Sequence, residues 1–75
     1  MKSVTIKLDM AESVKKFVNI ASKFDYELTL KSGRYVVDAK SILGIFSLDL
    51  AEPIVLEIGS DDCDDLLKAL DPFMA

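Results

Sequence analysis

Hydrophobic residues change their spacing several times along this chain, and these changes constrain its fold more than any other feature of the sequence. Over residues 3–8 apolar and polar side chains alternate, which is the period of a half-buried strand. From residue 11 to residue 24 the apolar side chains instead recur at the spacing of one helix face. The strand face comprises Val4, Ile6 and Leu8, and the helix stripe comprises Val14, Phe17, Val18, Ala21 and Phe24.

Alternation returns on both sides of Ser32-Gly33, over residues 26–31 and 34–39. Two such runs around a two-residue turn that contains glycine predict a β-hairpin. A short apolar turn or helix is expected from Ser41 through Phe46. Residues 53–58 then predict a fourth strand, whose inward side chains are Ile54, Leu56 and Ile58.

A second full helical stripe closes the chain and comprises Cys63, Leu66, Leu67, Leu70 and Phe73. We expect Ser60 or Asp61 to cap this helix, and Asp9 to cap the first one, because their side-chain oxygens can accept from first-turn N–H groups. Glu12 would complement the dipole of the first helix.

The acidic run Asp61, Asp62, Asp64 and Asp65 raises the question of a metal site. Its spacing does not match a calcium-binding loop, and no glycine lies within it. Carboxylates in the first turn of a helix are favoured by the dipole. We therefore expect a structural role, no bound metal and no cofactor.

The element order is β-α-β-β-α-β-α, and helices with one apolar face must cover the apolar face of the sheet. The fold class is therefore predicted as α+β, an open-faced two-layer sandwich in a single domain over residues 1–75. The formal net charge of −4 argues against a nucleic-acid partner. No apolar run approaches the roughly 20 residues that span a bilayer, and no signal peptide is evident, so a cytoplasmic location is expected.

Two segments, Ala21-Ser22-Lys23-Phe24-Asp25 and Lys40-Ser41-Ile42-Leu43-Gly44-Ile45-Phe46-Ser47-Leu48, lie in register around the predicted hairpin. The sequence resembles that of the HPr family in these segments and over nearly its whole length. HPr is the histidine-containing phosphocarrier of the sugar phosphotransferase system. The resemblance implies a four-stranded antiparallel sheet covered on one side by helices, and a carrier or binding protein that is not an enzyme.

The reactive loop departs from the family pattern, Gly-X-His-X-Arg-Pro. The histidine position falls on Met10, the arginine position on Glu12, and the glycine and proline positions on Leu8 and Ser13. The 75 residues contain no histidine. Because a thioether forms no useful phosphoryl adduct and Glu12 would repel phosphate, we predict that no residue carries phosphate catalytically.

Ser41 matches the family's regulatory serine, which resembles a target of a serine kinase in some bacteria. A hydroxyl at a helix start is also a good N-cap, and the two roles are compatible. Phosphorylation there would, by resemblance, favour binding to a transcriptional regulator in catabolite repression.

Four apolar residues follow Ser41 on one short element, where they cannot all be buried. In HPr-like proteins part of this face docks partner proteins. We therefore predict a partner-binding surface that comprises Met10, Ile42, Leu43, Ile45 and Phe46, against the alternative of core packing with scattered exposure. The predicted function is a regulatory or protein-binding module, possible partners being phosphotransferase components, a serine kinase or a regulator. A structural or assembly domain unrelated to sugar transport is the other interpretation, and the oligomeric state stays open.

Overall fold

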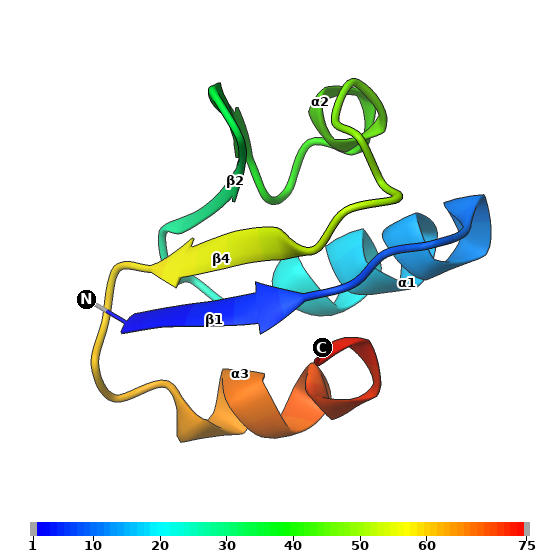
Figure 1. The fold of residues 1–75 in the computed structure, drawn as a ribbon. Coiled ribbons are helices and arrows are strands. Elements are labelled where there is room, and N and C mark those ends of the chain that lie inside the picture. The colour runs from blue at the N-terminus through cyan, green and yellow to red at the C-terminus, as the bar shows by residue number, and fades with distance from the viewer. Residues whose placement is uncertain (1, 75) are drawn as a thin grey trace.

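The computed structural model describes residues 2–74, and its elements follow the predicted order (Figure 1). They are β1 (Lys2–Ile6), α1 (Ala11–Ala21), β2 (Leu28–Ser32), β3 (Tyr35–Asp38), α2 (Ile42–Phe46), β4 (Ile54–Ile58), α3 (Asp64–Ala69) and the 3-10 helix η1 (Asp71–Phe73). None of the helices in this part of the chain is long and apolar enough to cross a membrane.

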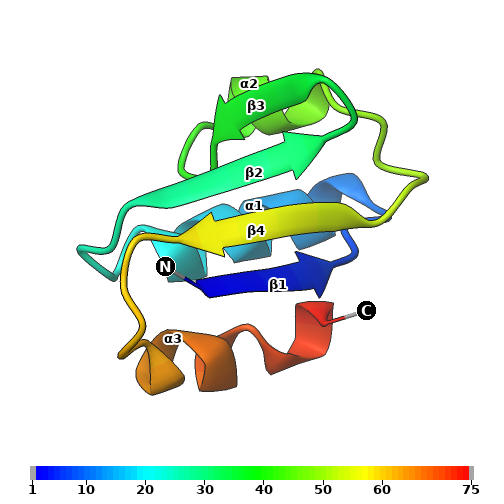
Figure 2. The same ribbon diagram turned by 60° about the vertical axis from the view of Figure 1, so that its left-hand side comes forward.

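The strands form one antiparallel sheet in the order β1-β4-β2-β3. The helices lie against one of its faces, with α1 behind the middle strands and α2 behind β3 (Figure 2). Leu30 pairs with Leu56 across β2 and β4, so the apolar side chains of neighbouring strands point to the same face. The predicted α+β, open-faced two-layer sandwich is therefore confirmed.

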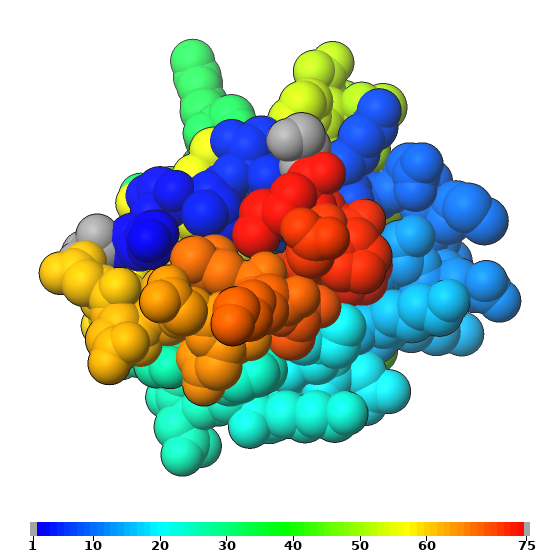
Figure 3. Space-filling model, turned by 90° about the horizontal axis from the view of Figure 1, so that it is seen from below, coloured from blue at the N-terminus to red at the C-terminus, as the bar shows by residue number. Residues whose placement is uncertain are grey.

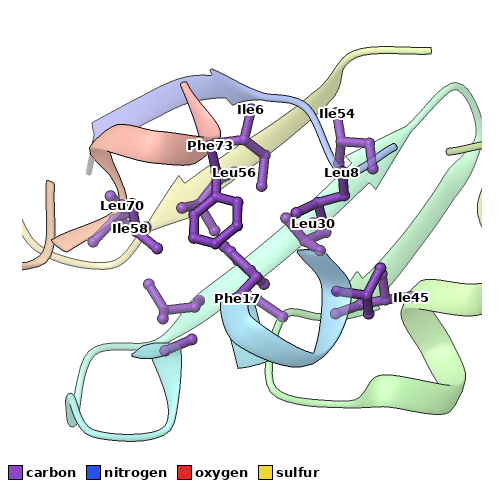
Figure 4. Close-up of a cluster of buried hydrophobic side chains, with 14 of the residues drawn as sticks. Ile6, Leu8, Phe17, Leu30, Ile45, Ile54, Leu56, Ile58, Leu70 and Phe73 are labelled. Carbon is purple, nitrogen blue, oxygen red and sulfur yellow. The ribbon is translucent and has the colours of Figure 1, made fainter. Parts of the chain in front are cut away.

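The core lies between the sheet and the helices (Figure 4). Its largest fully buried members include Phe17 of α1, Leu66 of α3 and the inward residues of β4. The opposite face carries polar side chains such as Lys31 and Glu57, whose Nζ and Oε1 atoms lie 2.8 Å apart. Lys31 pairs with Val55, which makes Lys31 and Glu57 diagonal cross-strand neighbours.

The hairpin turn lies one residue later than predicted. Ser32 pairs with Tyr35, so the two turn residues are Gly33 and Arg34 rather than Ser32 and Gly33. Gly33 has a φ of 58°, at the turn position where a type II′ hairpin favours glycine. The position of the turn depends on which residue can adopt a positive φ, and the alternation of apolar and polar residues does not determine that position.

Both predicted helix caps are wrong by a small number of residues. Met10 is the N-cap of α1, with extended backbone (φ −140°, ψ 154°), and it makes no side-chain cap hydrogen bond. Asp9 therefore precedes the capping position. Cys63 is the N-cap of α3, while the Ser60 hydroxyl instead accepts from the Asp62 N–H at 3.2 Å. That local turn uses the serine before the helix begins.

Candidate functional site

The start of α1 is where the family pattern would place its reactive loop. Met10 is 59% exposed, and its carbonyl accepts the helical hydrogen bond from the Val14 N–H at 3.2 Å. Glu12 lies in the first turn of α1 and is exposed. Leu8 is fully buried and belongs to the core. The loop therefore presents a thioether and a carboxylate to solvent. Leu8, which we match to the glycine position of the family pattern, packs in the core.

Ser41 caps α2, as predicted. Its Oγ accepts from the Gly44 N–H at 3.2 Å, and its own N–H donates to the Asp38 carbonyl at 3.0 Å. A Cβ atom on Gly44 would lie 3.2 Å from the Ser41 Oγ and 3.3 Å from the Val37 Cβ. Glycine at this position therefore lets α2 approach β3 closely, which fixes the direction in which α2 presents its side chains.

The apolar residues of α2 separate into one buried and three exposed side chains. Ile45 is fully buried, so its assignment to a partner-binding surface is wrong: it faces the sheet and packs in the core. Leu43 is 84% exposed, and Ile42 and Phe46 are 37% and 42% exposed. We call these three residues the α2 apolar surface. A short helix cannot turn four large side chains toward one neighbour, which is why the set divides.

Met10 is the other exposed residue of the predicted partner-binding surface. It precedes the first residue of α1, and helices α1 and α2 are in contact (Figure 1). Four of the five residues predicted for a partner-binding surface are therefore exposed. Their role in binding stays a prediction.

The acidic run at the start of α3 has structural contacts. The Tyr26 hydroxyl lies 2.9 Å from Oδ1 of Asp65 and 3.0 Å from the carbonyl oxygen of Asp62. The hydrogen bond to Asp65, followed by desolvation and the negative charge of Asp65, raises the pKa of Tyr26 to about 12. Within residues 2–74 no group of three or more acidic, cysteine or histidine side chains could hold a metal ion. The single thiol, Cys63, is buried in the core.

A groove that the sequence analysis missed lies between α1 and the C-terminal segment. It has a volume of about 640 Å³, and its walls carry Lys7, Lys16 and Lys23. Lys16 and Lys23 are seven residues apart, a spacing that places both on one side of a helix and its continuation. This spacing was the available signal, but only the fold brings the C-terminal segment beside it.

Comparisons with known proteins identify the family. The model for the family described as "PTS HPr component phosphorylation site" matches residues 3–75. The chain belongs to the HPr family. The HPr-C-His crystal structure from Thermoanaerobacter tengcongensis superposes with a TM-score of 0.79 at 34% identity, covering 96% of this chain and 89% of that one. The predicted resemblance is thus confirmed over nearly the full length.

Two further HPr structures agree. The phosphocarrier protein HPr from Bacillus anthracis str. Ames has a TM-score of 0.73 at 28% identity, covering 99% of this chain and 94% of its own. The histidine-containing phosphocarrier protein of Mycoplasma also reaches 0.73, at 20% identity, covering 95% and 86%. At that identity it supports the fold alone. A comparison with curated protein sequences found no significant match.

Proposed function

We propose that this chain is an HPr-family module that binds partner proteins without carrying phosphate on a histidine. One observation carries this proposal: the 75 residues contain no histidine. Met10, which we match to the family's histidine position, is the exposed N-cap of α1. We place the module in the cytoplasm, as a binding domain rather than an enzyme. Its partners are phosphotransferase components, a serine kinase or a transcriptional regulator.

The chemistry at the start of α1 supports the loss of phosphate transfer. A phosphoryl carrier needs a nucleophile that is reactive near neutral pH, together with cations that stabilise the transferring group. Met10 offers a thioether, and Glu12 adds negative charge in the first turn, where the family has arginine. The N-terminal dipole of α1 attracts anions, but a dipole does not supply a nucleophile.

Incubation with phosphoenolpyruvate and the first enzyme of the phosphotransferase system tests this loss. We expect the intact mass of this chain to stay unchanged, while a histidine-containing HPr in the same tube gains one phosphoryl group. A stoichiometric phosphoryl group on this chain would refute the proposal. The variant Met10→His, Glu12→Arg, Ser13→Pro leaves the buried Leu8 in place. If this variant gained a phosphoryl group while the parent chain did not, the loss of phosphate transfer would be due to these three side chains.

The binding half of the proposal rests on the α2 apolar surface. Leu43 has the largest exposed fraction among the exposed large hydrophobic side chains of residues 2–74. Substituting Leu43→Asp places a charge at the centre of an apolar contact, so we expect at least about tenfold weaker binding to whichever partner class binds. Val36→Asp is the matched control, since Val36 is 59% exposed on β3. Surface plasmon resonance with purified members of the three classes measures both variants.

The outcomes separate the proposal from its rivals. If Leu43→Asp left binding unchanged, the α2 apolar surface would not be part of the interface. The same conclusion would follow if Leu43→Asp and Val36→Asp weakened binding equally. Failure of every partner class to bind would favour an assembly domain unrelated to sugar transport. Genomic or biochemical neighbours outside phosphotransfer would point the same way.

Phosphorylation of Ser41 is the second candidate function. The Ser41 hydroxyl lies at the start of α2 with one accepted N–H, so a phosphate there would meet the positive end of that helix. Incubation with HPr kinase and ATP tests it by mass. A gain that disappears in Ser41→Ala supports regulation at this site, whereas no gain, or one that survives in the variant, argues against it.

A further inference from the structure

The groove between α1 and the C-terminal segment has chemistry that the proposed function does not use. One wall is α1 and the turn after it, which contribute Ser13, Lys16, Asn19 and Lys23. The other wall is Pro72–Met74, and Lys7 lies at the end of β1. Figure 3 shows the C-terminal segment, in red, directly beside the blue and cyan atoms of α1.

Three contacts hold the walls at a defined separation. The Lys7 N–H donates to the Phe73 carbonyl at 2.8 Å, and Ile6 forms an isolated antiparallel bridge with Met74. The Phe73 ring meets the ring of Phe17 on α1. These contacts tie the C-terminal segment to both β1 and α1. Tertiary contacts therefore fix the two walls of the groove relative to each other.

The charge of the groove is opposite to that of the protein. Its walls carry Lys7, Lys16 and Lys23 against one carboxylate, Asp9, a local formal charge of +2, while the whole chain carries −4. Within residues 2–74 the lysine ammonium groups that make an ion pair or a hydrogen bond are those of Lys31 and Lys40. The three groove lysines thus form no ion pair with a described carboxylate, and a net positive charge in a concave site attracts counter-ions.

We propose that this groove binds the phosphate group of a small metabolite. Lysine ammonium groups bind phosphate as point charges, and three of them line this groove. A phosphate group carries up to two negative charges near neutral pH, so one group can interact with several ammonium groups at once. Ser13 and Asn19 provide neutral donors beside the lysines, and Ile20 and Phe73 provide an apolar surface for the carbon skeleton. The volume of about 640 Å³ is in the range of small-molecule sites.

Titration with inorganic pyrophosphate, followed by two-dimensional amide NMR of the full chain, tests this site. We expect saturable shifts at the amides of residues 13–23 and 72–74. The double variant Lys16→Ala, Lys23→Ala should weaken binding about tenfold or more, because charge-assisted contacts are lost. Lys15→Ala is the matched control: this lysine is exposed on the same helix but lies outside the groove. It should leave the affinity within about twofold.

Each other outcome overturns the proposal. The absence of saturable shifts in the groove excludes the site, and equal weakening by Lys15→Ala means non-specific attraction to a lysine-rich helix. Citrate that binds as tightly as pyrophosphate excludes a preference for phosphate. Because Lys15, Lys16 and Lys23 are exposed, the variants should fold, and amide spectra that match those of the parent chain outside the substituted positions would show it. This experiment does not measure partner binding through α2. It therefore tests the phosphate site independently of the proposed function.

Discussion

The ring of Phe17 meets the ring of Phe73 edge to face, with centroids 6.0 Å apart and an interplanar angle of 88°. Phe17 is fully buried on α1, and Phe73 is 7% exposed in η1. The pair joins α1, the first helix of the chain, to η1, the last one. Both rings belong to the core, and Phe73 also lines the groove that carries Lys7, Lys16 and Lys23.

This ring pair should show a measurable coupling energy. In a double-mutant cycle with Phe17→Leu and Phe73→Leu, we expect about 0.5–1.5 kcal/mol of coupling, because edge-to-face rings contribute beyond their buried area. Urea unfolding of the four proteins measures it. Phe24→Leu is the control, since Phe24 stacks on Tyr26 instead and should combine additively with Phe17→Leu. A coupling of zero for the first pair would contradict the prediction.

The cap of α2 should contribute to stability. Ser41→Ala removes the acceptor of the Gly44 N–H, and we expect the free energy of unfolding to fall by about 1 kcal/mol. Ser41→Asp keeps an acceptor at the N-cap and should retain most of that stability. Chemical denaturation distinguishes them. If Ser41→Ala were as stable as the parent chain, the cap would have no energetic role.

Leu43 and Ile45 lie two residues apart on α2, and their truncation should change stability by very different amounts. Leu43→Ala changes an 84% exposed side chain, so the free energy of unfolding should change by no more than about 0.5 kcal/mol. Ile45→Ala leaves a cavity in the core and should cost about 2–5 kcal/mol. Thermal and urea unfolding measure both. Similar costs at the two positions would mean that α2 packs in another orientation.

The hydrogen bond of Tyr26 should make the free energy of unfolding depend on pH in the alkaline range. The neutral phenol donates the hydrogen bond, and the folded protein holds its pKa at about 12, above the ordinary value of 10.0. Because the folded pKa is raised, the contribution is complete below pH 10 and is lost as pH rises through about 12. The stability advantage of the parent chain over Tyr26→Phe should shrink across this window.

Two measurements check the origin of that shift. Alkaline absorbance titration should show one tyrosine ionising near pH 12 in the parent chain and not in Tyr26→Phe. Asp65→Asn removes the anionic acceptor while keeping an oxygen, so the pKa of Tyr26 should fall toward its ordinary value. An unchanged titration in Asp65→Asn would assign the shift to another cause.

Element order and most of the core could be predicted from hydrophobic spacing, because side-chain period is a local property of the chain. Ile54, Leu56 and Ile58 alternate in the sequence and all three are buried. The caps of α1 and α3 were misplaced, because a cap depends on the exact residue at which the backbone leaves the helix. Periodicity does not define that residue to better than a few positions.

The candidate site divides in the same way. The sequence by itself shows that the 75 residues contain no histidine, and its motif spacing predicts that Met10 and Glu12 stand at the positions of the reactive residues. Only the tertiary structure decided that Ile45 packs inward while Leu43 faces solvent, since this depends on how closely Gly44 lets α2 approach β3. It alone also brought Lys7 beside Phe73 to form the groove. Contacts between distant segments arise when apolar faces pack together, and local spacing carries no record of which faces will meet.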